Sequence, residues 1–377
     1  MVTATAWGTR IVLTSCILTE QVSAQSVPCW KRPRLEALAA GAARQVDTVP
    51  NNDRALLAWV VPDYVRALAR DAKQSADEET YNALRRYVLR ILITTDRARG
   101  VQDFTRTSRV VWGTFRNSTD SMQRIVYVAE SARLASALLE GAKTLTEHSG
   151  SDSLTLAAIG TAASALRSHD SEWRQSADSL GWYVIPDKMP FRYAGRDQPW
   201  PLNMQALAGV ALEEVGEAIG DSQMLHHARM IYRFVEHGVL STVRPDGHWD
   251  YWPDAPKGYP HHPDDIGHAS FTAEVLVLGE RYQPPRWAPV RTAVEANFRT
   301  FYPDSLAPGP GARADAFAPF ASDFARWVEW VPHSGRVRAT ATALGSSPGL
   351  WANAETYLFC SSLGYFGYAP SLSDPRK

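Results

Sequence analysis

The chain has 377 residues, of which 45% are hydrophobic, so it is long enough to bury a large core. Its net charge is −1 and its sequence pI is about 6.8, with basic and acidic residues interspersed. This balance excludes an extended basic surface for nucleic acid or an anionic membrane, and no composition break is long enough for a flexible interdomain linker. We therefore expect one domain over residues 25–377.

The first 25 residues have the features of an export signal. Arg10 precedes a short apolar run at residues 11–18, and the small residues 22–24 suit a cleavage site. We expect residues 1–24 to be a signal peptide and the protein to be secreted or periplasmic. An unstructured N-terminus is the alternative, and residues 13–16 also resemble a lipoprotein signal. No later run reaches the length of a membrane span.

Two thiols remain after removal of that segment, Cys29 and Cys360, one near each end of the mature chain. In an oxidising compartment they can form a disulfide that ties the termini together. Two buried free cysteines are an equally good interpretation of the sequence.

From residue 32 onward, apolar residues recur at spacings of three and four, while alternating runs typical of strands are scarce. Helices are predicted over residues 34–46, 53–74, 78–95, 120–147, 153–168, 171–179, 202–220, 222–237, 265–282, 286–301, 315–331 and 349–364. Successive antiparallel helix pairs with short polar loops predict an all-α fold, an (α/α) toroid. An irregular α-solenoid is the alternative, although no repeat of fixed period supports it.

Two loops interrupt this pattern with aromatic residues, proline and glycine, at residues 182–201 and 247–268. The second loop concentrates histidine, acidic and aromatic side chains, and such density is costly in a mere connector. It ends at Asp265, an N-cap for a helix whose first turn contains His268. Free N–H groups and the helix dipole favour anionic ligands at such a position.

Asn203 and His268 are therefore the candidate groups for chemistry on an acidic sugar. Removing a proton next to a carboxylate requires donors to that carboxylate and a base of suitable pKa. Asn203 and His268 can be the donors, a tyrosine or a histidine such as His262 the base, and Arg196 and Arg244 the cations for the sugar. A helix cap for Asn203 and a core histidine for His268 are the structural alternatives.

Other residues of the two loops suit substrate binding. His248, His261 and Asp265 can hydrogen-bond a sugar, and aromatic rings can stack on its faces. Those rings belong to Trp182, Tyr183, Trp200, Trp249, Tyr251, Trp252 and Tyr259. Their structural alternative is packing at the ends of helix pairs.

Two alternatives use the acidic groups of the same loop. A divalent cation could be bound by His261, His262, Asp264, Asp265 and His268, although their spacing fits no established metal motif, so no cofactor is obligatory. A hydrolase with paired acids would combine Asp250, Asp254, Asp264 or Asp265 with Glu172 or Glu355. The sequence alone does not place any two of these acids together.

The order of several short motifs over residues 180–285 resembles the helical-toroid polysaccharide lyases and related uronate-acting proteins. These motifs are Pro201-Leu-Asn203, Asp221 at a helix start, His227-Ala228, Gly247-His-Trp-Asp-Tyr-Trp252 and Asp264-Asp-Ile-Gly-His-Ala269. The resemblance implies an (α/α) barrel, an acidic polysaccharide as substrate and β-elimination without a redox cofactor. It implies that Asn203 and His268 neutralise the carboxylate, and it leaves the base open among Tyr251, Tyr259 and Tyr302. A glycoside hydrolase and a non-catalytic glycan-binding protein are the alternative functions.

Overall fold

The computed structural model describes residues 28–177, 179–193, 197–252, 263–279, 287–302, 324–346, 350 and 352–365. Most of these residues are helical, as the sequence predicts. The elements are α1 (Arg32–Asp47), α2 (Leu56–Ser75), α3 (Glu78–Ile93), α4 (Asp96–Arg99), α5 (Val128–Ser149), α6 (Ser153–Arg167), η1 (Asp170–Glu172), β1 (Trp173–Gln175), β2 (Gly181–Tyr183), α7 (Leu202–Ile219), α8 (Ser222–Thr242), α9 (Ile266–Gly279), α10 (Trp287–Phe301), η5 (Trp327–Trp330), α12 (Gly335–Ser346) and α13 (Ala354–Tyr365).

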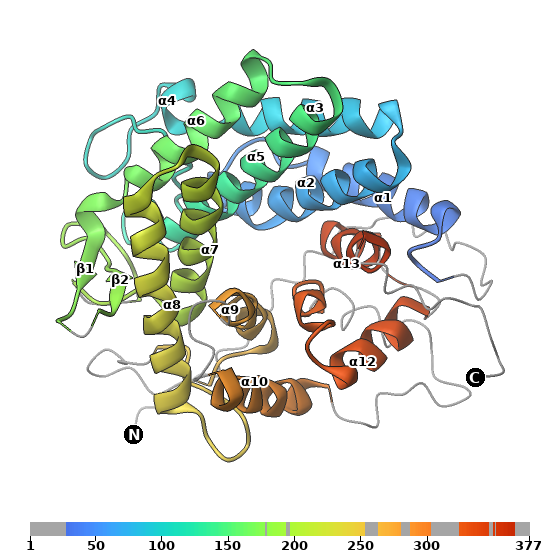
Figure 1. Ribbon diagram of the computed structural model, residues 1–377. Coiled ribbons are helices and arrows are strands. Elements are labelled where there is room, and N and C mark those ends of the chain that lie inside the picture. Colours follow the sequence, from blue (N-terminus) through green and yellow to red (C-terminus); the bar gives the residue numbers. More distant parts are fainter. Residues whose placement is uncertain are drawn as a thin grey trace, which may run out of the picture.

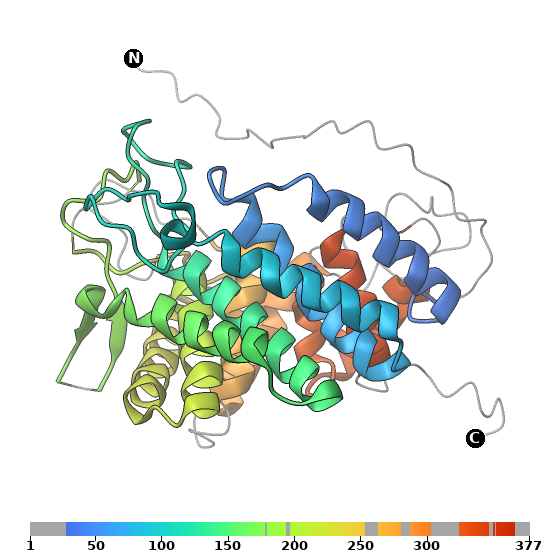
Figure 2. The ribbon, with the colours of Figure 1, turned by 90° about the horizontal axis from the view of Figure 1, so that it is seen from above.

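The helices form a closed double ring, an (α/α) toroid (Figure 1). The inner ring runs α2, α5, α7, α9, η5 and α13, and α13 packs back against α2. The outer ring contains α1, α3, α6, α8, α10 and α12, and each of these packs on its inner neighbours. Figure 2 shows α13 beside the first helices of the chain. The predicted fold class is confirmed, and the solenoid alternative is wrong because the two ends of the helix series meet.

A disulfide between Cys29 and Cys360 closes the ring covalently, with 5.5 Å between the two Cα atoms. Both residues are fully buried. Close backbone packing accompanies the bond, because a Cβ atom on Gly41 of α1 would lie 2.2 Å from the Cβ atom of Ala352. Of the two interpretations of the cysteines, the structure shows the disulfide.

Local capping explains where several helices begin. Asp77 accepts hydrogen bonds from the first turn of α3, Asp152 forms a capping box at α6, and Asp221 accepts bonds from the first turn of α8. Gly220 ends α7 in the left-handed region at φ 69°. These short polar junctions fold the helices into antiparallel pairs. No helix in the described ranges is long and apolar enough to cross a membrane.

Three predicted helices need correction. Residues 120–127 precede α5 as a loop, in which Ile125 forms an isolated β-bridge with Thr114. The helix predicted at 171–179 is wrong, because β1 pairs with β2 and Trp173 stacks on His227 at 3.9 Å between ring centroids. The described part of the helix predicted at 315–331 contains only the 3-10 helix η5, and α12, which the sequence did not predict, follows it.

Candidate active site

The aromatic loop at residues 248–252 is joined by backbone hydrogen bonds to the starts of two inner helices. The N–H of Leu202, at the start of α7, donates to the carbonyl of Tyr251 at 3.1 Å. The N–H of Asp264, just before α9, donates to the carbonyl of Trp249 at 2.8 Å. The structure therefore brings the two sequence regions of the predicted site together at one end of the inner ring. We call this end the mouth.

His268 and Asp265 form an ion pair at the mouth. The Asp265 carboxylate accepts the backbone N–H of His268 at 2.9 Å, and its other oxygen lies 2.8 Å from His268 Nδ1. Burial lowers the pKa of His268, but the hydrogen bond and the charge of Asp265 outweigh it, so the pKa is raised above its usual value. Burial alone would raise the pKa of Asp265, but the hydrogen bond and the charge of His268 outweigh it, so the pKa of Asp265 is lowered. The pair is thus stabilised as imidazolium and carboxylate, and the imidazole side chain is still 40% exposed.

Asp264 lies beside this pair but has the opposite protonation behaviour. Its side chain is buried, and Oδ2 accepts a hydrogen bond from Trp249 Nε1 at 3.0 Å. Oδ1 has no hydrogen-bond partner among the described residues. Burial, together with the charge of Asp265, raises the pKa of Asp264 to about 7 against the opposing charge of His268. Asp264 can therefore take up or release a proton near neutral pH.

Tyr251 lies against His268, with 4.8 Å between ring centroids. Burial and the charges of Asp264 and Asp265 raise the pKa of its phenol. The hydroxyl keeps its proton at neutral pH, so Tyr251 is suited to donate a proton rather than to accept one.

Asn203, in the first turn of α7, is fully buried. Neither its side-chain oxygen nor its nitrogen has a hydrogen-bond partner among the described residues. An unpaired buried amide costs free energy, and the capping role considered from sequence is not formed here. The amide therefore keeps hydrogen-bonding capacity at the start of α7 that no described residue uses.

Some of the aromatic rings that were predicted to stack on a sugar are buried inside the protein instead. Trp200 and Trp249 are fully buried and Tyr183 is 1% exposed, so these three rings pack inside the protein and present no face to a sugar. Trp200 packs on Tyr127, and Trp249 instead supports Asp264. This corrects their expected role. Trp182 and Trp252 are half-buried and keep accessible surface.

The remaining predicted residues are distributed as follows. Arg244 forms an ion pair with Asp250, so both charges are already engaged. His248 lies edge-on to Phe301 at 5.3 Å, and its buried Nδ1 has no hydrogen-bond partner among the described residues. Tyr302 is 1% exposed and packs within an aromatic core. Its predicted role as the base is therefore wrong, because its ring does not reach the surface where a substrate would bind. Arg196, Asp254, Tyr259, His261 and His262 lie outside the described residues.

The acids considered from sequence for a paired-acid hydrolase do not all lie at the mouth. Glu172 is buried in a pair with His169, and Glu355 interacts with Asp63 inside the ring. Among the candidate acids that the structure describes, Asp264 and Asp265 remain as adjacent acids at the mouth. Within the described ranges, no group of three or more side chains could hold a metal ion.

Sequence reasoning missed Arg116, a charged residue that acts on this site, and Glu130, a buried acid on which the charge of Arg116 also acts. The charge of Arg116 lowers the pKa of Tyr251 and that of His268, so its guanidinium lies within electrostatic range of both. Arg116 is exposed and has no ion-pair partner in the part of the chain that the structure describes. Burial raises the pKa of Glu130 to about 8, although Asn52 and Trp59 donate hydrogen bonds to it. No motif marks Arg116, which lies in the loop before α5.

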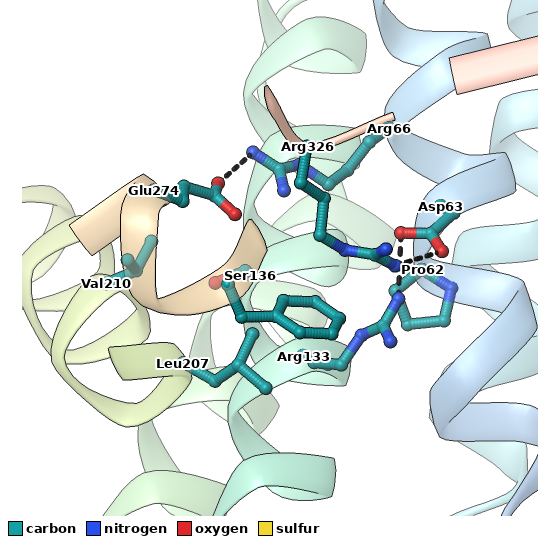
Figure 3. A pocket seen from close by; sticks show the side chains of 10 residues that line it. Pro62, Asp63, Arg66, Arg133, Ser136, Leu207, Val210, Glu274 and Arg326 are labelled. Atoms are coloured by element: carbon teal, nitrogen blue, oxygen red, sulfur yellow. Dashed lines mark hydrogen bonds and ion pairs between the residues drawn. The ribbon is translucent and has the colours of Figure 1, made fainter. Parts of the chain in front are cut away.

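Below the mouth, the inner helices place charged side chains toward the axis at helical spacing (Figure 3). On α2, Asp63 is followed three residues later by Arg66, and on α9 Glu274 follows Phe271 by the same spacing. Two charged residues at a spacing of three on a largely apolar stretch, as in Asp63 and Arg66, were the sequence signal available for this arrangement.

Comparisons with known proteins agree with this architecture. No family model and no curated protein matches the sequence. The structure of D-mannose isomerase is similar, with a TM-score of 0.55 and 11% identity over 91% of this chain and 100% of that chain. The Lin0763 protein from Listeria innocua is similar with a TM-score of 0.52 and 11% identity, over 88% of this chain and 96% of that chain. At these identities the likeness shows a shared fold.

Proposed function

We propose that this protein is a secreted or periplasmic enzyme that acts on an acidic, uronate-containing polysaccharide and cleaves it by β-elimination. The observation that carries this proposal is the His268–Asp265 ion pair beside Asp264 and Tyr251 at the mouth. Such an elimination requires a group that neutralises the carboxylate, a base and a proton donor, and a cation, a carboxyl group that titrates near neutral pH and a protonated phenol can fill these roles. The similarity to D-mannose isomerase supports a carbohydrate substrate, since that protein is a sugar isomerase on the same fold. We also propose that residues 25–377 form a single domain.

In the proposed reaction, the imidazolium of His268, the guanidinium of Arg116 and the amide of Asn203 receive the uronate carboxylate. Ionised Asp264 removes the proton at C5, and the C–H electron pair forms the C4–C5 double bond. The C4–O4 bond breaks, and Tyr251 gives its proton to the leaving oxygen. Proton exchange with solvent then returns Asp264 and Tyr251 to their starting states. The cations act mainly on the transition state, in which the carboxylate group gains charge.

Hydrolysis is the second candidate, favoured by one observation. Asp264 has a raised pKa while that of the adjacent Asp265 is lowered, and opposite shifts of two neighbouring acids suit a general acid and an ionised partner. In that reaction Asp264 would donate its proton to the glycosidic oxygen.

Product analysis distinguishes these reactions. The purified chain is incubated with a panel of polyuronates and with neutral polysaccharides as controls. Elimination yields reducing ends together with the ultraviolet absorbance of an unsaturated uronate, and hydrolysis yields reducing ends without that absorbance. Binding without either product would identify a glycan-binding protein and overturn the enzymatic proposal. Asp264→Asn is the control variant, because its product formation should fall to background in either reaction.

A further inference from the structure

The inner ring encloses a small cavity about one helical turn below the mouth. Its volume is about 20 Å³, which accommodates one or two water molecules or a single monatomic ion and is too small for a sugar or a carboxylate. Figure 3 shows the side chains that line it, contributed by α2, α5, α7, α9 and the segment before η5. Phe271 is one turn beyond His268 on α9, and Leu207 is one turn beyond Asn203 on α7. The cavity is therefore separate from the reacting groups of the mouth.

Two arginines beside the cavity share one carboxylate. Asp63 Oδ1 accepts from Arg133 Nη2 at 2.7 Å, and Asp63 Oδ2 accepts from Arg326 Nη2 at 2.5 Å. We call these three residues the buried charge cluster, because their side chains are at most 8% exposed. Arg133 Nη1 has no hydrogen-bond partner among the described residues. The buried charge cluster therefore keeps one buried donor that no described residue uses.

The buried charge cluster also carries one net positive charge. Although burial opposes it, the two guanidinium charges lower the pKa of Asp63, so this carboxylate is ionised. Burial and the charge of Arg326 lower the pKa of Arg133 to about 10 against the opposing charge of Asp63, so Arg133 keeps its proton at neutral pH. Burial and the charge of Asp63 raise the pKa of Glu355, which favours its neutral form. A charge removed from water costs free energy unless a counter-charge accompanies it.

The acids around Arg66 have their own cations. Glu274 pairs with Arg66 at 3.1 Å, and Glu140 pairs with Arg66 at 3.1 Å and with Arg70 at 3.6 Å. Burial raises the pKa of Glu214 to about 7, so this acid carries little charge below that pH. These acids therefore leave the charge of the buried charge cluster largely unbalanced.

Aromatic rings hold the two guanidinium groups in place. Arg326 lies 3.9 Å and Arg133 5.0 Å from the centroid of Phe271. Arg133 also lies 4.9 Å from the ring centroid of Trp59. A guanidinium is only weakly hydrated, so an anion replaces its water at low cost. A water molecule beside Arg133 would satisfy the donor and leave the charge unbalanced, whereas a monatomic anion does both.

We propose that this cavity binds a chloride ion, which accepts a hydrogen bond from Arg133 Nη1 and balances the buried charge cluster. The ion lies where α2, α5 and the segment before η5 meet, so its effect is on the stability of the ring. The site is independent of the reaction at the mouth.

Crystals of the protein soaked in sodium bromide locate the site directly, because bromide replaces chloride and gives an anomalous signal. We expect an anomalous peak within hydrogen-bond distance of Arg133 Nη1. A water molecule at that place without anomalous signal, or bromide bound only at the protein surface, would overturn the proposal.

Thermal unfolding measures whether the ion stabilises the fold. The Tm of the parent should be higher in sodium chloride than in sodium gluconate of equal ionic strength, by about 2 °C or more, because gluconate is too large for the cavity. Arg133→Met should lose this difference. The matched control, Arg174→Met, should keep it, because Arg174 forms an exposed pair with Asp197.

A second variant tests the cavity without altering any charge. Leu207→Phe adds volume to the cavity wall and should lose the difference between the two salts even if Arg133→Met does not fold. A parent with the same Tm in both salts, or a folded Leu207→Phe protein that keeps the parental difference, would contradict the proposal.

Discussion

The mouth and the buried charge cluster of the inner ring, formed by Asp63, Arg133 and Arg326, use the same kinds of charged residue in opposite ways. At the mouth, the Asp265 and His268 side chains are 64% and 40% exposed, and they are neighbours in sequence. In the buried charge cluster, the three side chains are at most 8% exposed and come from positions up to 263 residues apart. Charges that water reaches can change partner or protonation state at little cost, whereas buried charges must remain paired. The mouth is therefore suited to chemistry, and the buried pairs contribute to the stability of the ring.

The largest expected effect follows from breaking the buried pairs. Asp63→Asn leaves the guanidinium groups of Arg133 and Arg326 without their shared anion, and should lower the free energy of unfolding by about 3–5 kcal/mol. Urea denaturation monitored by circular dichroism measures this. The matched control is Asp197→Asn, because the pair of Asp197 with Arg174 is exposed and should contribute about 0–1 kcal/mol. Equal losses in the two variants would contradict the contrast between buried and exposed pairs.

The exposed pair should instead affect activity. His268→Ala removes a donor that acts on the transition state and should lower kcat about a hundredfold or more. The fold should persist, because no large apolar volume is removed. Steady-state kinetics on a polyuronate cleaved by the parent checks this, with the exposed His226→Ala as matched control. Nearly full activity in a folded His268→Ala protein would assign the histidine to packing.

Asn203 offers a test of whether the mouth acts as one unit. If Asn203 and His268 serve the same carboxylate, Asn203→Ala should also reduce kcat strongly, and the double variant should lose less than the two single losses combined. A double-mutant cycle measured on the same substrate supplies the coupling. Strict additivity would place the two side chains on separate groups.

Whether a region could be predicted from the sequence depends on how far apart its residues lie along the chain. The mouth was predictable because Trp249, Tyr251, Asp264 and His268 lie in one short stretch between helices. The ring was predictable from helical periodicity and short capped junctions. The buried charge cluster was not predictable, because Asp63, Arg133 and Arg326 meet only when the ring closes, and each looks like an ordinary helix residue in its own segment. The burial of Trp200 also could not be predicted, since an aromatic residue in a proline-rich loop fits a lid or an exposed sugar platform equally well.

Closure of the ring supports both regions, and the disulfide tests its contribution. Replacing both cysteines, Cys29→Ser with Cys360→Ser, should lower the free energy of unfolding by about 2–4 kcal/mol, because the unfolded chain gains freedom. Thermal unfolding of the double variant beside the parent, each with and without reductant, measures this. Reductant should lower the Tm of the parent and leave that of the variant unchanged. A parent insensitive to reductant and equal in Tm to the variant would show that the bond does not contribute.

The smallest expected effect, a shift of the pH profile, tests how the mouth is tuned. In β-elimination, Asp264 must be ionised, so activity should rise with pH through about 7, the raised pKa of Asp264. His268 must be protonated, so activity should fall again at higher pH, above its raised pKa. Asp265→Asn removes the charge that raises both values, and both limbs should therefore move to lower pH. If hydrolysis occurs instead, Asp264 must hold its proton, and activity should fall as pH rises through about 7. Profiles of kcat/KM for parent and variant decide between these outcomes, and a variant profile that coincides with the parent's would show that Asp265 does not tune the site.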